Sequence, residues 1–324
     1  MNGLGANGQL RANGTLRHLL TLEGLPRALL EALLEQAQRY VRAPGVRIPP
    51  SNLLSGVTVA NLFTEPSTRT RVSFELAAKR LGAQVINLEV QLSSRAKGES
   101  MLDTVYTLEA LHADVLVIRE AEVGVLGLVA SHVAPHVSVL SAGEAHVAHP
   151  TQGLLDALTV RQRKRSFDNL SIAIVGDIRH SRVARSAYHA FRALGVPELR
   201  IVAPPAFMPE ADEFTGAARF GTLKTGLKDV DVVMMLRIQK ERMTHASLPD
   251  GDRYFAKFGL TPERLALAKP DAIVMHPQPM NRGIEIASDV ADGPQSAIRD
   301  QVRNGVAVRM AVLAAVAGAP GAPA

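Results

Sequence analysis

The chain has 324 residues, which predicts two domains at about 150 residues each. Its apolar fraction of 47% and charged fraction of 21% are typical of globular proteins and exclude a disordered chain. No apolar run reaches the roughly 18 residues that a membrane span needs, and the N-terminus has no apolar secretory core. We therefore expect no membrane partner. The lack of cysteine excludes disulfides and thiolate chemistry, and it favours a cytoplasmic protein.

The net charge of +5 and the pI of about 9.7 allow three kinds of partner: nucleic acid, a membrane surface or small anions. Trp is absent, aromatic residues make up 4%, and Lys and Arg are scattered along the chain. The densest basic run, 161–165, lies at the end of a predicted helix, where it complements the helix dipole. We therefore expect no nucleic-acid partner, and the charge has functional meaning only where single arginines enter motifs.

Short apolar runs alternate with helical patterns along most of the chain. After a helix at 27–41, the first series has strands at 57–63, 84–88, 114–118 and 137–140 and helices at 74–81, 101–112 and 123–133. A long helix at 150–165 precedes a second series, with strands at 172–175, 200–202, 230–236 and 272–275, a helix at 183–194 and a last helix at 301–316.

This alternation predicts an α/β fold with two domains, each a parallel β-sheet flanked by helices. The helix at 150–165 would join them, and the C-terminal helix would return to the first domain. The expected bounds are 15–150, together with about 301–318, for the first domain and 151–300 for the second.

The strongest local feature is the run EPSTRTR at 65–71, between a predicted strand and a predicted helix. Unpaired backbone N–H groups and the positive end of the dipole make a helix N-terminus suited to an anion. Three hydroxyls and a guanidinium add to it, from Ser67, Thr68, Thr70 and Arg69. A plain capping motif is the alternative, but a cap needs only one such residue. A phosphate site is therefore favoured.

The run STRTRVSFE, which starts at Ser67, resembles the signature of the carbamoyltransferases, which move a carbamoyl group from carbamoyl phosphate to an amine. Three further motifs follow in the family's order: HPTQ at 149–152, RIQKER at 237–242 and HPQP at 276–279, continued as MNRG. The RIQKER run is similar to an element of the aspartate carbamoyltransferases. The resemblance covers about 15–318, and it identifies the first domain with carbamoyl phosphate and the second with aspartate.

The resemblance implies that the STRTR residues hold the phosphate of carbamoyl phosphate. Arg119 matches the arginine that bridges phosphate and carbonyl oxygen, His149 the donor to the carbamoyl oxygen, and Gln152 the residue that holds the carbamoyl nitrogen. Such donors stabilise the charge that grows on that oxygen as the amine attacks. The implied catalytic residues are Arg69, Arg119 and His149, and Gln278 and Pro279 would contribute mainly backbone carbonyls to carbamoyl phosphate.

In the second domain, GDIRHSRVARS at 176–186 matches the family's GD-x4-R element, and a GxGxxG fingerprint for NAD is absent. Arg182 would hold the substrate's α-carboxylate, and Arg237, with Gln239 beside it, the side-chain carboxylate. Two arginines suit two carboxylates, which points to aspartate. Glu65 and Arg242 match residues that pair across the closed domain interface; the alternative is a surface ion pair of little energetic value.

The segment QLSSRAKGES at 91–100 is by itself a flexible polar loop. By resemblance, its Ser93 and Lys97 reach into the active site of a neighbouring subunit, and Lys97 is placed by the KGE triplet. Two features depart from the family: Gln278 stands where other members have small or apolar residues, and the N-terminal Gly/Asn-rich extension has no match.

We therefore expect an aspartate carbamoyltransferase of pyrimidine biosynthesis that uses carbamoyl phosphate and L-aspartate and needs no metal or organic cofactor. A homotrimer with shared active sites is implied, and family members also occur with regulatory chains or with dihydroorotase. The first alternative is ornithine carbamoyltransferase, whose HCLP loop needs a cysteine that this chain lacks. The second is a catalytically silent structural homologue, which should have lost motif residues.

Overall fold

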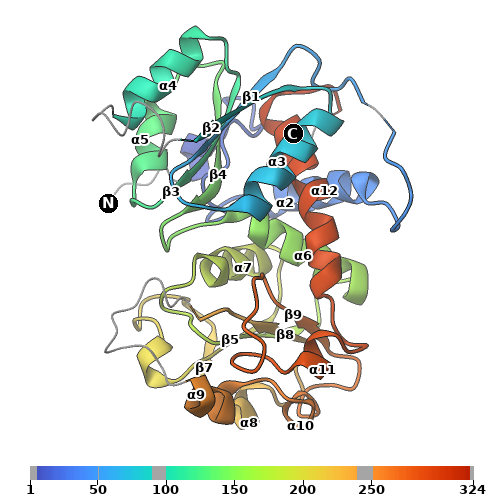
Figure 1. Cartoon of the computed structure of the whole chain (residues 1–324). Coiled ribbons are helices and arrows are strands. Elements are labelled where there is room, and N and C mark those ends of the chain that lie inside the picture. The colour runs from blue at the N-terminus through green and yellow to red at the C-terminus, as the bar shows by residue number, and fades with distance from the viewer. Residues whose placement is uncertain (1–5, 50, 90–99, 239–250, 322–324) are drawn as a thin grey trace. The chain divides into compact units, whose positions relative to one another are not determined.

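The computed structural model describes residues 6–49, 51–89, 100–238 and 251–321 (Figure 1). The chain divides into two compact units. The first comprises Met1–Leu155 and Arg303–Ala324, and the second Asp156–Val302. Two helices, α6 (Pro150–Lys164) and α12 (Ile298–Val316), carry the chain from one unit to the other. In the described part, no helix combines the length and apolar character needed to cross a membrane.

The first unit is built on a four-stranded parallel sheet in the order β2-β1-β3-β4. Its strands are β1 (Thr58–Phe63), β2 (Gln84–Glu89), β3 (Val115–Glu120) and β4 (Ser138–Glu144). Its helices are α1 (Ala6–Gln9), α2 (Arg27–Tyr40), α3 (Thr68–Arg80), α4 (Met101–Ala110) and α5 (Val125–His132). Strands β1, β3 and β4 are buried along almost their whole length, as expected for a parallel sheet covered on both faces.

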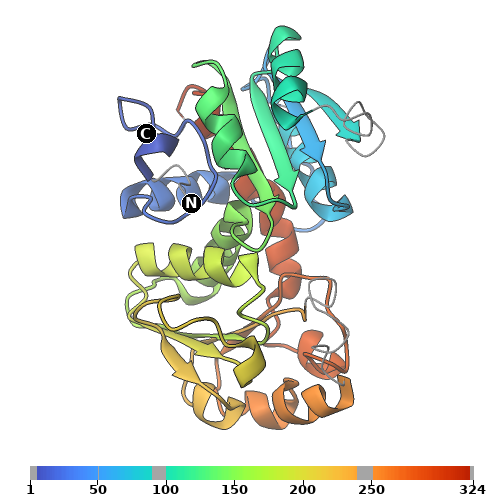
Figure 2. The same ribbon diagram turned by 90° about the vertical axis from the view of Figure 1, so that its left-hand side faces the viewer.

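Helices α4 and α5 cover one face of this sheet (Figures 1 and 2). Val105 of α4 and Leu126 of α5 are fully buried in one apolar cluster with Leu62 of β1, Ile118 of β3 and Val139 of β4. Helix α3 contacts β1 and β2. Because α3 connects two parallel strands, its N-terminus begins at the edge of the sheet where β1 ends.

The second unit has a five-stranded parallel sheet in the order β7-β6-β5-β8-β9. The strands are β5 (Ser171–Val175), β6 (Glu198–Val202), β7 (Ala218–Phe220), β8 (Val232–Met235) and β9 (Ile273–Met275). The helices are α7 (Arg182–Ala193), α8 (Leu223–Gly226), α9 (Gly251–Phe258), α10 (Pro262–Leu265) and α11 (Ser288–Ala291), with a 3-10 turn at Pro205–Phe207.

Two parallel α/β sheets are confirmed, but several predicted bounds are wrong. Helix α3 begins at Thr68 rather than residue 74, because the run STRTRV is polar and carries no apolar period. Strand β3 continues to Glu120, so Arg119 lies within the strand and not after it. Strand β7 was not predicted, since its three residues are exposed or half-buried and lack an apolar run.

Candidate active site

Three segments of the first unit meet at the carboxyl edge of its sheet. The β1–β3 register pairs Phe63 with Arg119, and the β3–β4 register pairs Arg119 with Gly143, with a register shift after Ile118. The STRTR run follows β1, and the HPTQ run follows β4. The structure therefore brings the phosphate-site candidates and Arg119 to one edge, where parallel sheets bind ligands.

The N-terminus of α3 is not capped by its own side chains. Ser67 occupies the N-cap position, but its hydroxyl makes no capping hydrogen bond. Thr68 and Arg69 are exposed, and within the described chain Arg69 forms no ion pair. Thr70 is 7% exposed, and its carbonyl accepts a hydrogen bond from the Ser73 hydroxyl (2.9 Å). The capping alternative for this motif therefore lacks its hydrogen bond, and the positive helix end remains available to an anion.

Arg119 is held at the same edge by contacts on both sides of its strand. Its Nη2 lies 3.2 Å from a Glu65 carboxylate oxygen, and its Nη1 donates to the Ala142 carbonyl at 3.4 Å. The Arg119 carbonyl accepts hydrogen bonds from the Thr64 backbone N–H and hydroxyl, both at 3.0 Å. Glu65 thus has a partner in Arg119, whereas Arg242, its expected partner, lies outside the described residues.

The other acidic groups at this edge already have backbone donors. The Glu144 carboxylate accepts from the N–H groups of Gly124 (2.9 Å) and Leu126 (3.2 Å) at the start of α5. Burial raises the pKa of Glu144, the two backbone bonds oppose that rise, and the nearby Glu120 adds to it. Glu120 accepts from the Ala121 N–H at 2.8 Å. The carboxylates of Glu120 and Glu144 therefore stabilise the loops that follow β3 and precede α5.

His149 and Gln152 lie at the start of α6. The His149 carbonyl accepts the N–H groups of Gln152 (2.9 Å) and Gly153 (3.3 Å), which forms the first turn. His149 is 6% exposed and Gln152 8%. The two side chains are therefore in a desolvated place, where hydrogen bonds to a substrate carbonyl are strong.

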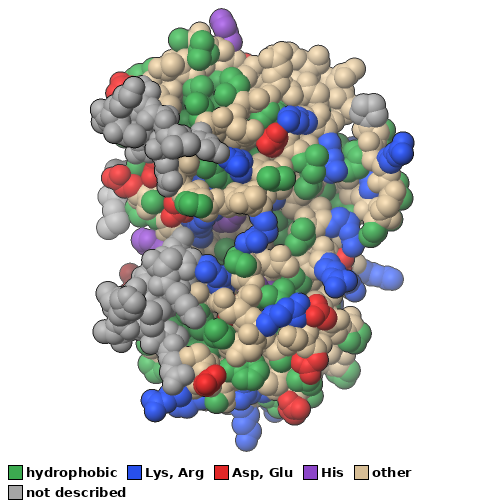
Figure 3. All heavy atoms as spheres, viewed as in Figure 1, with side chains coloured by type: hydrophobic (Ala, Val, Ile, Leu, Met, Phe, Trp, Pro, Cys, Tyr) green, Lys and Arg blue, Asp and Glu red, His purple; other side chains and the backbone are tan. Residues whose placement is uncertain are grey.

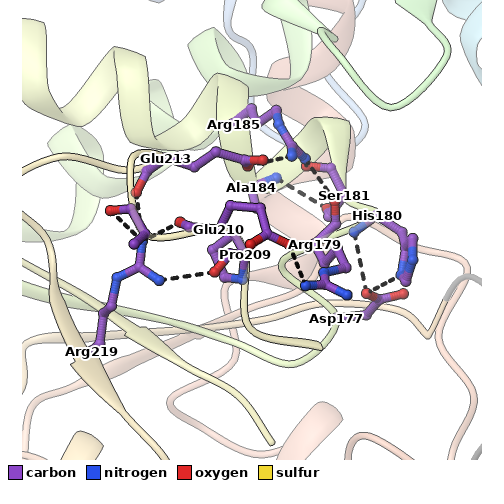
Figure 4. A network of polar contacts seen from close by, with 11 residues as sticks. Asp177, Arg179, His180, Ser181, Ala184, Arg185, Pro209, Glu210, Glu213 and Arg219 are labelled. Carbon is purple, nitrogen blue, oxygen red and sulfur yellow. Dashed lines mark hydrogen bonds and ion pairs between the residues drawn. The ribbon is translucent and has the colours of Figure 1, made fainter. Parts of the chain in front are cut away.

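In the second unit, Arg182 is the first residue of α7 and is buried, with 6% exposure. This helix end is capped: the Ser181 hydroxyl accepts the Ala184 N–H at 3.1 Å. Ahead of it, the fully buried Asp177 accepts from the Nδ1 of His180 (2.8 Å) and from its backbone N–H (3.3 Å). The loop that delivers Arg182 is thus fixed by its own side chains (Figure 4).

Two ion pairs tie this loop and the first turn of α7 to the segment after β6 (Figure 4). Arg179 pairs with Glu210 at 2.6 Å, and Arg185 pairs with Glu213 at 2.5 Å. Arg219 then donates to backbone carbonyls of the same segment: Pro209 (2.9 Å), Glu210 (2.6 Å), Ala211 (3.3 Å) and Glu213 (2.7 Å). Arg179, Arg185 and Arg219 therefore fix the segment 209–213 against the start of α7, where Arg182 lies.

Arg237 lies at the carboxyl edge of the second sheet, two residues after β8 ends. Strand β8 pairs with β5, and the register sets Val175 beside Met235. Gly176 has φ +124°, and a Cβ there would lie 3.2 Å from the Leu236 carbonyl oxygen. This close approach requires glycine. The loop that leads to Arg182 and the residue before Arg237 therefore start side by side, at the ends of the adjacent strands β5 and β8.

The HPQP loop is held by a buried hydrogen-bonded chain. His276 Nδ1 accepts the Gln278 N–H at 2.9 Å, so its Nε2 carries the proton and faces Glu285 at 3.3 Å. The His276 N–H donates to Gln301 (2.9 Å), whose amide donates to Asp156 (2.8 Å).

Gln278 has φ +57°, a strained left-handed conformation for a residue other than glycine, and its bond to Pro279 is cis. Gln278 is half-buried and Pro279 is exposed, and both belong to the second unit. Their contact with carbamoyl phosphate stays a prediction.

Four expected residues lie outside the described residues: Ser93, Lys97, Gln239 and Arg242. Sequence reasoning missed the support residues Glu285 and Arg219. For Glu285 the sequence offered a signal, a lone acid in the apolar run IEI. For Arg219 it offered none. On the face drawn in Figure 3, basic side chains lie among apolar and acidic ones.

The family models agree with this arrangement. Residues 17–162 match the model described as aspartate/ornithine carbamoyltransferase, carbamoyl-P binding domain. Residues 168–316 match the model described as aspartate/ornithine carbamoyltransferase, Asp/Orn binding domain.

Solved structures resemble the chain over almost its whole length. Aspartate transcarbamoylase from Trypanosoma cruzi, in complex with carbamoyl aspartate and phosphate, is 31% identical over 93% of this chain and 95% of that chain, with a TM-score of 0.78. The same enzyme with N-(phosphonacetyl)-L-aspartic acid is 31% identical over 98% of both chains, with a TM-score of 0.79. Ornithine carbamoyltransferase from Pyrococcus furiosus is 27% identical over 98% and 99%, with a TM-score of 0.81. The chain thus belongs to the aspartate/ornithine carbamoyltransferase family.

Proposed function

We propose that this chain transfers the carbamoyl group of carbamoyl phosphate to the amine of L-aspartate. The products are N-carbamoyl-L-aspartate and phosphate, and the reaction is the early committed step of pyrimidine (UMP) biosynthesis. The support is the uncapped, arginine-bearing helix end of the first unit, taken together with the two arginines of the second. Similar solved structures of an aspartate transcarbamoylase hold carbamoyl phosphate and aspartate.

The observation that carries the choice of aspartate is the position of Arg182 and Arg237. They follow β5 and β8, which are adjacent parallel strands, and so they share one edge of the second sheet. Two guanidinium groups suit two carboxylates, because each pairs bidentately with one. The cationic side chain of ornithine would be repelled by Arg237. The family's ornithine-binding HCLP loop also needs a cysteine that the chain lacks.

The chemistry follows from position and charge. Ser67, Thr68, Thr70 and the Arg69 guanidinium hold the phosphate. Arg119 and His149 polarise the carbamoyl carbonyl, and Gln152 holds the carbamoyl nitrogen. The aspartate amine attacks the carbamoyl carbon, the bond from that carbon to the phosphate oxygen breaks, and the departing phosphate accepts the amine proton. The accelerating factors are alignment of the reactants and stabilisation of the developing oxyanion.

A substrate comparison tests this function. Purified protein is incubated with carbamoyl phosphate and either L-aspartate or L-ornithine, and released phosphate and carbamoylated product are measured. Product with aspartate alone is expected, and the His149→Ala variant serves as the inactive control. Turnover with ornithine alone would assign the chain to the other branch, and turnover with neither would support the silent homologue.

We also propose a homotrimer in which Ser93 and Lys97 complete the site of the neighbouring subunit. The support is the KGE triplet at 97–99, which matches the family's KGE, since a lysine in a polar stretch of sequence gains a function when an anion is brought to it. Association with regulatory chains or dihydroorotase stays a prediction, as does the cytoplasmic location.

Complementation tests the shared site. Lys97→Ala and His149→Ala remove groups from opposite sides of one site, so each variant should be inactive alone. Unfolded and refolded together, they should regain part of the wild-type activity, because some mixed sites contain both residues. Hybrid trimers that form and remain inactive would contradict the shared site, as would a fully active monomer.

A further inference from the structure

A buried arginine in the first unit has no acidic partner among the residues that the structure describes. Arg309 of α12 is 5% exposed, and its Nη1 donates to the Gly305 carbonyl at 3.0 Å. Its guanidinium carbon lies 5.0 Å from the centre of the Phe74 ring. Among the described residues, no carboxylate lies within ion-pair distance of Arg309. Burial lowers the pKa of Arg309 to about 10, so it remains charged at neutral pH.

This arrangement is unfavourable for folding alone. A buried charge without an opposite charge loses its hydration and regains little. The helix also carries Gly305 in its interior, where glycine is less favourable than alanine. A Cβ at Gly305 would lie 2.8 Å from the Arg309 Nη1, so glycine leaves room for the guanidinium. The fold therefore tolerates both a buried charge and a glycine inside a helix, each of which is unfavourable for stability.

Arg309 lies between the two helices that carry the carbamoyl phosphate candidates. Phe74 is on α3, seven residues or about 10 Å along the axis from Ser67, and helical side chains lean toward the N-terminus. A Cβ at Gly305 would also lie 3.5 Å from Leu155 of α6, which is one turn beyond Gln152. The buried charge is therefore close behind both the STRTR and the HPTQ ends.

We propose that Arg309 is a positioning residue whose buried charge attracts the dianionic phosphoryl group of carbamoyl phosphate into the first unit. This inference rests on the proposed function. The substrate supplies the negative charge that Arg309 lacks within the described protein. The low dielectric between α3, α6 and α12 lets the attraction act over this distance. Contact with the substrate is left to the STRTR residues.

A purely structural role is the competing account, in which Arg309 pins α12 to Phe74 by cation–π stacking. The two accounts predict different effects of removing the charge on stability and on phosphate affinity. Arg309→Met keeps an apolar stem of similar length and removes the charge. If Arg309 serves the anion, the ligand-free variant should be at least as stable as the wild type and should bind phosphate more weakly. If Arg309 only packs α12 against Phe74, the variant should be less stable than the wild type, and its phosphate affinity should not change.

The experiment measures thermal unfolding without ligand and calorimetric affinity for inorganic phosphate and carbamoyl phosphate. For Arg309→Met we expect an undiminished unfolding midpoint and roughly 10- to 100-fold weaker binding of both ligands. Arg309→Lys should retain most of the affinity. Arg39→Met is the control, since it removes an exposed arginine on α2 that pairs with Glu35.

Gly305→Ala supplies a second variant that keeps the charge and displaces the guanidinium, and we expect it to weaken phosphate binding by a smaller factor. Unchanged phosphate affinity in both Arg309→Met and Gly305→Ala would overturn the inference. A wild-type protein that binds neither phosphate nor carbamoyl phosphate would instead refute the proposed function itself.

Discussion

Helices α3 and α7, one in each unit, both have a serine at the N-cap position, and the two serines act differently. Ser67 leaves α3 uncapped, whereas Ser181 caps α7 through the Ala184 N–H. At α3 the backbone itself is offered to an anion, with Arg69 exposed beside it. At α7 the backbone is satisfied, and the helix instead presents a buried side chain, Arg182.

The difference fits the chemistry of the two proposed ligands, a phosphate for the first unit and a carboxylate for the second. A phosphate has several oxygens and is bound well by a row of N–H groups and hydroxyls at a helix end. A carboxylate is planar and is best held by a guanidinium whose position is fixed. The first unit therefore leaves its helix end open, and the second builds ion pairs around the segment that carries its arginine (Figure 4).

The largest effect expected at the open end is that of Arg69→Ala. The side chain has no ion-pair partner in the described protein, so the fold should persist. Turnover should fall roughly 100- to 1000-fold, because a positioned donor to developing charge is lost. Steady-state kinetics measures this, with Lys79→Ala as the control, since Lys79 is exposed on the same helix and pairs with Glu75. Near-normal turnover in Arg69→Ala would remove the phosphate-site assignment.

Replacing each of the two N-cap serines by alanine sharpens the comparison. Ser181→Ala should cost about 0.5–2 kcal/mol of unfolding free energy, because a helix cap is lost. Ser67→Ala should change stability by less than about 0.5 kcal/mol, since no capping bond is removed, but it should weaken phosphate binding. Denaturant unfolding and phosphate titration of both variants measure the two effects. A large loss of stability in Ser67→Ala would show that the helix end is capped after all.

The smallest effect concerns acid stability of the first unit. His18 Nδ1 accepts the Val139 N–H at 3.0 Å, and burial, followed by Arg17 and Arg11, lowers its pKa to about 3. The unfolded chain, with a pKa near 6.5, binds the proton more readily, so this contribution is full above about pH 6.5 and is lost as pH falls toward 3.

The unfolding midpoint should therefore decrease from pH 7 to pH 5. His18→Asn keeps an acceptor and removes the titration, so its midpoint should depend less on pH. The exposed His132 provides the control, His132→Asn, with an unchanged profile. The idea fails if the wild type and His18→Asn show the same slope.

The order of strands and helices was predictable because it depends on local pattern. Apolar runs such as VLVIRE mark buried parallel strands. The anion site at the STRTR run stays a prediction, with which the uncapped N-terminus of α3 is compatible. The start of α3 was missed because its first turn is polar. The end of β3 was missed because Arg119 and Glu120 are charged.

What sequence could not predict depends on tertiary contacts. The Glu65–Arg119 pair joins residues 54 positions apart, and it depends on the β1–β3 register. The tautomer of His276 is set by the turn at Gln278. Burial of Arg309 depends on Phe74 of α3, which is far from it in sequence.

The proposal that the first unit binds phosphate and the second binds the dicarboxylate is tested most directly by calorimetry with two ligands and two variants. Inorganic phosphate is titrated first, and succinate, an unreactive dicarboxylate, is titrated at saturating phosphate. Arg69→Ala should lose phosphate affinity, whereas Arg237→Ala should keep it and lose about 2–5 kcal/mol of succinate binding. Equal weakening of both ligands by Arg237→Ala, or of neither by Arg69→Ala, would contradict the assignment of phosphate to the first unit and dicarboxylate to the second.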